Sequence, residues 1–196
     1  MGSGESGGAR RVIRSFVGLP VPPGAVRKVE VLQDGLPTAR AVLPEHLHLT
    51  LAFLDDQPQS ALREVAAALD EVRSGPIGIS LSGIKLMGGR QPAAIAIGAD
   101  GGDALIRLQA RVAHAIRSVG IDLERRRFRP HVTIFRLSKR VARDDAPRIQ
   151  TWIDAVAPFD PISYTVDTMS FYRSILSKSG AVYDVLADYP LIGRDI

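Results

Sequence analysis

Two short segments of the chain repeat the same arrangement of side chains that can transfer protons and bind anions. His48 and Thr50 lie in HLTLAFL, and His131 and Thr133 lie in HVTIFRL. One neutral imidazole can take a proton from water while a protonated one donates to a leaving oxygen, and hydroxyl groups can donate hydrogen bonds to phosphate oxygens. The two segments therefore indicate acid–base cleavage of a phosphodiester, a scheme that requires no metal and no other cofactor.

Each segment predicts a β-strand with two different faces. Because residues two apart in a strand project to the same side, His48 lies beside Thr50, and His131 lies beside Thr133. Arg129 shares the face of His131, where its guanidinium could bind a phosphate or simply face solvent. The opposite faces carry apolar residues that we expect in the core, namely Leu47, Leu49, Leu51, Phe53, Val132 and Ile134.

The spacing of apolar and turn-forming residues predicts an α+β fold. Strands are expected at 11–19, 47–54, 77–87, 93–98, 131–137, 162–172 and 181–187, with helices at 25–32, 60–73, 103–120 (capped by Asp103) and 149–156. Each His-x-Thr strand is followed by a helix and two strands, which indicates an internal duplication with two antiparallel sheets facing each other across a groove. We expect residues 1–10 to form a disordered tail and residues 11–196 to form one domain of two lobes.

Composition and charge narrow the class of protein. The 196 residues include no cysteine, which excludes disulfides and thiol chemistry, and no run of about 20 apolar residues that would cross a membrane. We therefore expect a cytoplasmic protein. Net charge is only +4, but the segment from Glu124 to Arg143 holds eight bases and one acid. Such a segment favours a polyanionic partner, although a solvated basic loop would have the same composition.

Four stretches of the sequence resemble one known family. They are RSFVGLPVPP, PEHLHLTLAFL, FRPHVTIFRL and MSFYRSILSKSGAVYDVLADYPL, and the resemblance extends over nearly the whole chain, from the first stretch to the last. They are similar to the first strand, the two HxTx motifs and the C-terminal hairpin of the RNA 2′,3′-cyclic phosphodiesterases, also called 2′-5′ RNA ligases. These enzymes belong to the 2H phosphoesterase superfamily.

The resemblance implies a fold, a reaction and a set of site residues. The fold would be the two-lobed, internally duplicated 2H phosphoesterase fold, with helices outside a central groove. His48 would be the proton donor and His131 the proton acceptor, with Thr50 and Thr133 as phosphate ligands. The enzyme would open the 2′,3′-cyclic phosphate end of RNA to a 2′-phosphate, and could join RNA ends in the reverse direction. We expect a monomer with no obligate protein partner.

Other residues are candidates for substrate binding, or depart from the family pattern. Phe16 and Tyr172 could stack on the terminal base or belong to the core, and Arg173 could reach the groove or face solvent. Three departures affect the expected substrate details: His46 stands in place of an amide, Asp55 stands in place of a frequent Gly, and the strand AAIAIG lacks a Trp.

Three alternative functions fit the same residues. His46, His48 and His131 could form the ligand set of a metallohydrolase, although Arg129 would repel the cation. The basic segment and the aromatic residues could instead form a non-catalytic RNA-binding module. A related 2H enzyme acting on 2′-5′ oligonucleotides or small cyclic nucleotide phosphates would use the same His and Thr residues, but the basic segment favours RNA ends.

Overall fold

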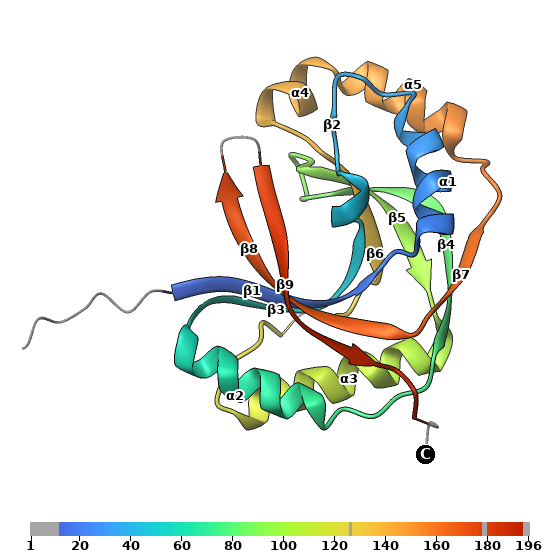
Figure 1. Ribbon diagram of the computed structural model, residues 1–196. Helices are drawn as coiled ribbons and strands as arrows, with labels where there is room; N and C mark the ends of the chain where they lie inside the picture. Colours follow the sequence, from blue (N-terminus) through green and yellow to red (C-terminus); the bar gives the residue numbers. More distant parts are fainter. Residues whose placement is uncertain (1–11, 126, 178–179, 194–196) are drawn as a thin grey trace, which may run out of the picture.

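A computed structural model of the chain describes residues 12–125, 127–177 and 180–193 (Figure 1). The predicted tail, residues 1–10, lies outside this range. The elements follow one another as β1 (Val12–Pro20), α1 (Pro23–Gln33), β2 (Arg40–Ala41), the 3₁₀ turn η1 (Pro44–His46), β3 (His48–Pro58), α2 (Gln59–Asp70), β4 (Ile77–Met87), β5 (Ala94–Asp100), α3 (Gly102–Ser118), β6 (His131–Arg136), α4 (Lys139–Asp144), α5 (Ala146–Val156), β7 (Ile162–Val166), β8 (Thr168–Ser177) and β9 (Gly180–Pro190).

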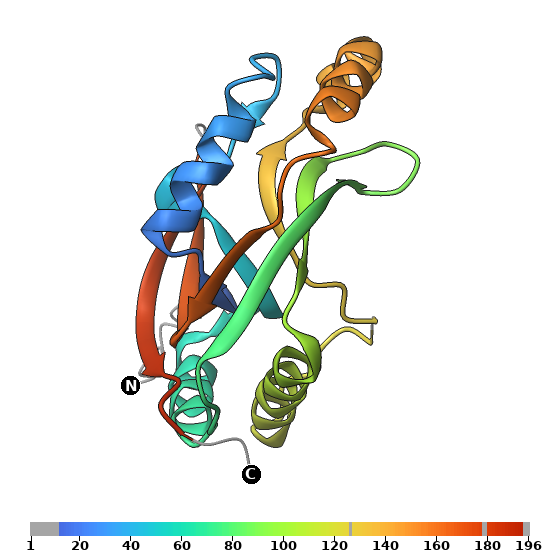
Figure 2. The same cartoon turned by 90° about the vertical axis from the view of Figure 1, so that its right-hand side faces the viewer.

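The strands form one antiparallel sheet in the order β7-β4-β5-β6-β3-β1-β8-β9, with the short β2 beside β6. Strands β6 and β3 pair only between Leu49 and Val132, so this contact divides the sheet into two four-stranded halves. Figure 2 shows that the sheet is strongly curled, with β8 and β9 on one side of the molecule and β4 to β6 on the other. The predicted α+β fold is confirmed, and the two expected antiparallel sheets are the halves of one continuous sheet, joined where the two His-x-Thr strands meet.

Two helices pack against the half of the sheet opposite to the strand that they follow. Helix α1 follows β1 but packs against β6 and β7, whereas α3 follows β5 but packs against α2 and β3 (Figure 1). Helix α3 shows why such helices form, because Leu105, Leu108, Val112 and Ile116 recur on one face and are all buried. This exchange covers the outer, apolar side of both halves and leaves the side that carries the two histidines uncovered by helices. Among the described residues, no helix is long and apolar enough to cross a membrane.

Three predictions about local structure are wrong. The strand expected at 162–172 is two strands, because the chain leaves β7 at Val166 and enters β8 at Thr168 in the other half of the sheet. No Gly or Pro marks this crossing. Asp103 does not cap α3; the Asp100 carboxylate instead accepts a hydrogen bond of 2.8 Å from the backbone N–H of Gly102, where the helix begins. Phe53 is not in the core but is 60% exposed.

Candidate active site

The exposure of Phe53 follows from an irregularity that both His-x-Thr strands share. Between β1 and β3 the register skips Leu51, and between β5 and β6 it skips Ile134. Each skipped residue is the fourth of its aligned segment, and the β-bulge that it forms reverses the alternation of faces beyond it. His and Thr lie before the bulge, and the residue two positions after it returns to their face. That residue is Phe53 in β3 and Arg136 in β6.

One cavity of about 660 Å³ collects these side chains. The four residues of the two motifs, His48, Thr50, His131 and Thr133, all line it. Among the described residues that line it there are three arginines, Arg14, Arg40 and Arg136, and no Asp or Glu. The remaining lining residues include the aromatic or imidazole side chains of Phe16, His46, Phe53 and Tyr183. The cavity therefore suits a ligand that combines negative charge with a flat ring.

The two imidazoles are oriented by the same backbone contact. His48 Nδ1 lies 2.7 Å from the carbonyl oxygen of His46, and His131 Nδ1 lies 2.7 Å from that of Arg129. A carbonyl only accepts hydrogen bonds, so Nδ1 carries the proton in both rings and donates it. Each Nε2 is then left to exchange a proton with a ligand. The two motifs thus share the tautomer of their histidines as well as their residue types.

Burial distinguishes His48 from His131. The His48 ring stacks on Phe16 with 4.6 Å between ring centroids and meets Tyr183 edge-on at 5.1 Å. The pKa of His48 is lowered to about 4, chiefly by burial of the ring; the hydrogen bond to His46 acts in the opposite direction, and the nearby charges of Arg136 and His131 contribute to the lowering. At neutral pH and with no ligand, His48 is therefore neutral, and it must gain a proton before it can act as a donor.

The predicted substrate-binding residues occupy different positions around this cavity. Phe16 lines the cavity, although it is only 2% exposed. Its ring stacks against the imidazole of His48. Tyr172 is buried, and its ring lies 4.8 Å from that of Phe16 and 5.9 Å from that of His48. The guanidinium of Arg173 forms an ion pair with the carboxylate of Asp184, with 2.6 Å between nitrogen and oxygen. The side chain of Arg129 is exposed and does not line the cavity. The substrate-binding roles of these four residues stay predictions.

Arg40 and Arg136 line the cavity, although no role in the site was predicted for either of them. They lie directly opposite each other in the β2–β6 pair, and neither makes an ion pair within the described part of the chain. Like charges facing each other across two strands destabilise a sheet, so this position favours an anion between them. Arg136 could have been found by extending the aligned repeat to the sixth residue. A two-residue strand such as β2 gives no comparable signal for Arg40.

Asp55, which stands in place of a frequent Gly, is explained by its backbone. Its φ angle is +53°, in the left-handed region that Gly adopts most readily and that Asp tolerates better than most residues. Its carboxylate lies 3.2 Å from the guanidinium of Arg14, which lines the cavity. The departure from the family pattern thus adds an ion pair at the edge of the site.

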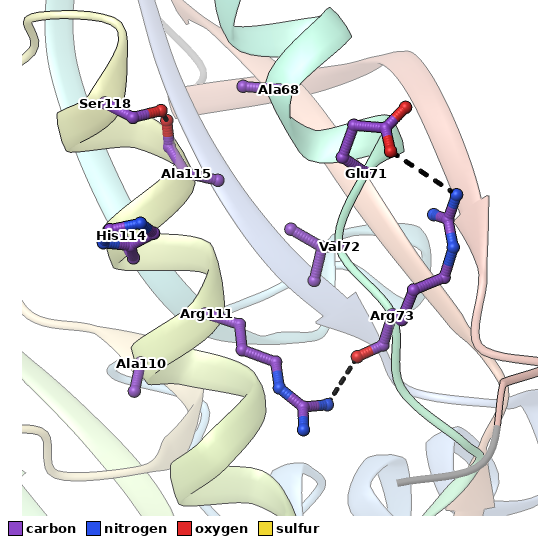
Figure 3. Close-up of a pocket in the computed structure, with 9 residues that line it drawn as sticks. All are labelled: Ala68, Glu71, Val72, Arg73, Ala110, Arg111, His114, Ala115 and Ser118. Carbon is purple, nitrogen blue, oxygen red and sulfur yellow. Dashed lines mark hydrogen bonds and ion pairs between the residues drawn. The ribbon is translucent and has the colours of Figure 1, made fainter. Parts of the chain in front are cut away.

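Two further observations bear on other kinds of site. Over the described residues, no cluster of three or more His, Asp or Glu side chains is placed to hold a metal ion. A second cavity, of about 690 Å³, lies between α2 and α3 (Figure 3). It is lined by His114 and by Arg111, which donates a hydrogen bond to the carbonyl of Arg73. Since α2 and α3 cover the core side of β3, this cavity lies on the opposite face of the sheet from the two motifs.

Comparison with known proteins identifies the class to which this fold and site belong. The sequence model of the 2′-5′ RNA ligase superfamily matches residues 20–176, and the chain is a member of that superfamily. The resemblance read from the motifs is confirmed. The solved structure of TT0787 of Thermus thermophilus superposes with a TM-score of 0.74 at 23% identity, covering 92% of this chain and 99% of that one. Escherichia coli LigT complexed with 3′-AMP gives a TM-score of 0.72 at 19% identity, over 92% and 98% of the two chains.

Within the superfamily, the similar curated proteins carry one name, RNA 2′,3′-cyclic phosphodiesterase. The protein of that name from Geobacillus stearothermophilus is 28% identical over 185 residues, which is 91% of this chain but 57% of that relative's length. The one from Aeropyrum pernix is 26% identical over 158 residues, or 80% of this chain and 88% of the relative. The one from Thermotoga maritima is 29% identical over 148 residues, or 74% and 75%.

Proposed function

We propose that this protein hydrolyses the 2′,3′-cyclic phosphate end of RNA to a 2′-phosphate. The observation that carries the proposal is the pair of equivalent imidazoles, each with its Nδ1 fixed on a backbone carbonyl and a Thr beside it, in one cavity lined by arginines. The shared name of the relatives supports the substrate. The expectations that the enzyme is a cytoplasmic monomer without an obligate protein partner stay predictions.

The proposed reaction uses one nitrogen from each motif. His131 Nε2 takes a proton from water as the water oxygen attacks phosphorus, the bond from phosphorus to O3′ breaks, and His48 Nε2–H protonates the O3′ that leaves. Thr50 and Thr133 donate hydrogen bonds to the non-bridging oxygens, and Arg136 offsets the charge that develops there. The product is a 2′-phosphate beside a free 3′-hydroxyl. The same two imidazoles in the same roles would support joining of RNA ends through a 2′-5′ linkage: His131 Nε2 would take the proton of a 5′-hydroxyl whose oxygen attacks phosphorus in place of water, the bond to O3′ would break, and His48 Nε2–H would protonate O3′.

The ligand itself supplies the condition under which His48 can act as the donor. A phosphate anion next to the ring favours its protonated form, opposing both burial and the charge of Arg136. We expect the His48 ring to titrate with a pKa near 4 in the free protein, and this pKa to rise by at least about one unit when a 2′-nucleotide is bound. NMR of the imidazole carbons against pH, with and without 2′-AMP, measures both values. An unchanged titration in the complex would assign the donor role to another group.

The reaction is tested directly on a short RNA that ends in a 2′,3′-cyclic phosphate. We expect turnover in excess EDTA at the same rate as in its absence, because the side chains of the cavity complete the acid–base scheme without a cation. The product is identified by resistance to a 3′-specific phosphatase treatment and by comparison with authentic 2′- and 3′-phosphate ends. Loss of turnover in EDTA that Zn²⁺ or Mn²⁺ restores would instead support the metallohydrolase alternative.

A further inference from the structure

Strand β5 presents only small residues to the groove. Ala94, Ala96 and Gly98 alternate along the strand with Ile95 and Ile97, and all five are buried. The first three share the face of the second motif, because Ala96 pairs with Thr133 and Gly98 pairs with His131. This is the strand that lacks the expected Trp. Small side chains at these positions leave room for the side chain of a neighbouring strand to cover them next to the second motif.

Lys85 fills part of that space. It pairs with Ala96 from the next strand, β4, so it projects to the same face as Thr133. A Cβ built on Gly98 would lie only 2.7 Å from the Lys85 Nζ and 2.8 Å from its Cε. The ammonium therefore lies over Gly98, directly beside His131, and any larger residue at position 98 would displace it.

The charge of Lys85 is uncompensated. Its side chain is exposed, and within the described part of the chain it makes no ion pair and no side-chain hydrogen bond. The backbone N–H of Ala99 donates a 3.0 Å hydrogen bond to the carbonyl of Pro130, which holds the end of the basic segment beside β5. The exposed Arg127 and Arg129 belong to that segment. Lys85 thus lies between the catalytic cavity and a second group of bases.

Lys85 is poorly placed to bind the cyclic phosphate itself. Neighbouring strands are about 4.8 Å apart, so an ammonium over β5 lies about one strand from His131 and about two strands from His48. A phosphate between the two imidazoles is nearer to Thr50 and Thr133. Because a 2′,3′-cyclic phosphate is at the 3′ end of its strand, every further phosphate of the substrate lies on the 5′ side.

We propose that Lys85 binds the phosphodiester immediately 5′ of the terminal nucleotide, and that the strand continues from there toward Arg129 and Arg127. This inference rests on the proposed function and specifies its substrate class: a single-stranded RNA of several nucleotides, in preference to a nucleoside 2′,3′-cyclic phosphate. Contact with a backbone phosphate carries no base preference, so the preference is for chain length and not for sequence.

The test compares two substrates, a cyclic-phosphate-ended RNA decamer and cytidine 2′,3′-cyclic phosphate. For Lys85→Met, which keeps the length of the stem, we expect kcat/KM on the decamer to fall about tenfold more than on the mononucleotide. The slope of log kcat/KM against log salt on the decamer should become shallower by about 0.7, as expected for one lost phosphate contact to a single strand. Lys85→Arg should retain most of the activity, and the matched control Lys28→Met, at an exposed lysine of α1, should resemble the wild type on both substrates.

The outcomes separate this inference from the proposed function. Wild-type protein that hydrolyses neither substrate contradicts the proposed function. Wild-type protein that hydrolyses the decamer, with Lys85→Met losing equal factors on both substrates or none on either, overturns only the role of Lys85. Equal kcat/KM of the wild type on the two substrates would also overturn the preference for a chain.

Discussion

Replacing either motif histidine should abolish nearly all turnover while leaving the fold intact. For His131→Ala and for His48→Ala we expect kcat on a cyclic-phosphate-ended RNA to fall by about 10³-fold or more, since a positioned acid or base contributes typically 10² to 10⁴. The double variant should lose little more than either single one, because the two groups act in the same step and their effects are not additive. Single-turnover kinetics, with substrate and product separated by chromatography, measure this loss.

Two comparisons make the result specific to the site. His114→Ala removes an exposed imidazole on α3, on the other face of the sheet, and should leave kcat unchanged. Binding of the RNA to His131→Ala should remain measurable, because the arginines of the cavity are still present. If both motif variants kept wild-type kcat, acid–base catalysis by these histidines would be refuted. Wild-type protein that binds RNA without turnover would point to the non-catalytic RNA-binding module.

The sequence predicted those parts of the fold and site that depend on local pattern. Apolar periodicity located α1, α2, α3 and α5 but not the short α4. The aligned His and Thr residues indicated that two strands carry the same chemistry. Residues two apart share a face of any regular strand, so placing His48 with Thr50 required no tertiary information. The antiparallel arrangement in two halves followed from the repeated order of elements.

What the sequence did not show depends on pairing between distant strands. The bulges at Leu51 and Ile134 exist only relative to β1 and β5, and simple alternation therefore placed Phe53 in the core. Arg40 reaches the site through a two-residue strand that has no periodicity of its own. The low pKa of His48 arises from burial against aromatic rings of β1 and β9, which are far from it in sequence. Long-range contacts thus decide how the predicted residues behave.

Removing the charge of Arg136 should reduce activity and stabilise the fold at the same time. A hydrogen bond to a charged group contributes about 1.5–3 kcal/mol, so for Arg136→Gln we expect kcat/KM to fall roughly 10- to 100-fold. The repulsion between Arg136 and Arg40 disappears in this variant, which should raise the free energy of unfolding by about 0.2–1 kcal/mol. Steady-state kinetics and urea denaturation measure the two effects on the same preparation.

The pKa of His48 provides a third, independent measurement on this variant. Arg136 is one of the charges that lower this pKa, so it should move upward, toward the ordinary value, in free Arg136→Gln. The control Arg63→Gln, at an exposed arginine of α2 outside the cavity, should change neither kcat/KM nor the titration of His48. An Arg136→Gln variant that is less stable than the wild type would mean that the guanidinium supports the fold. A variant with unchanged kcat/KM would mean that the pair of facing arginines binds no part of the substrate. Their position opposite each other would then need an explanation other than catalysis.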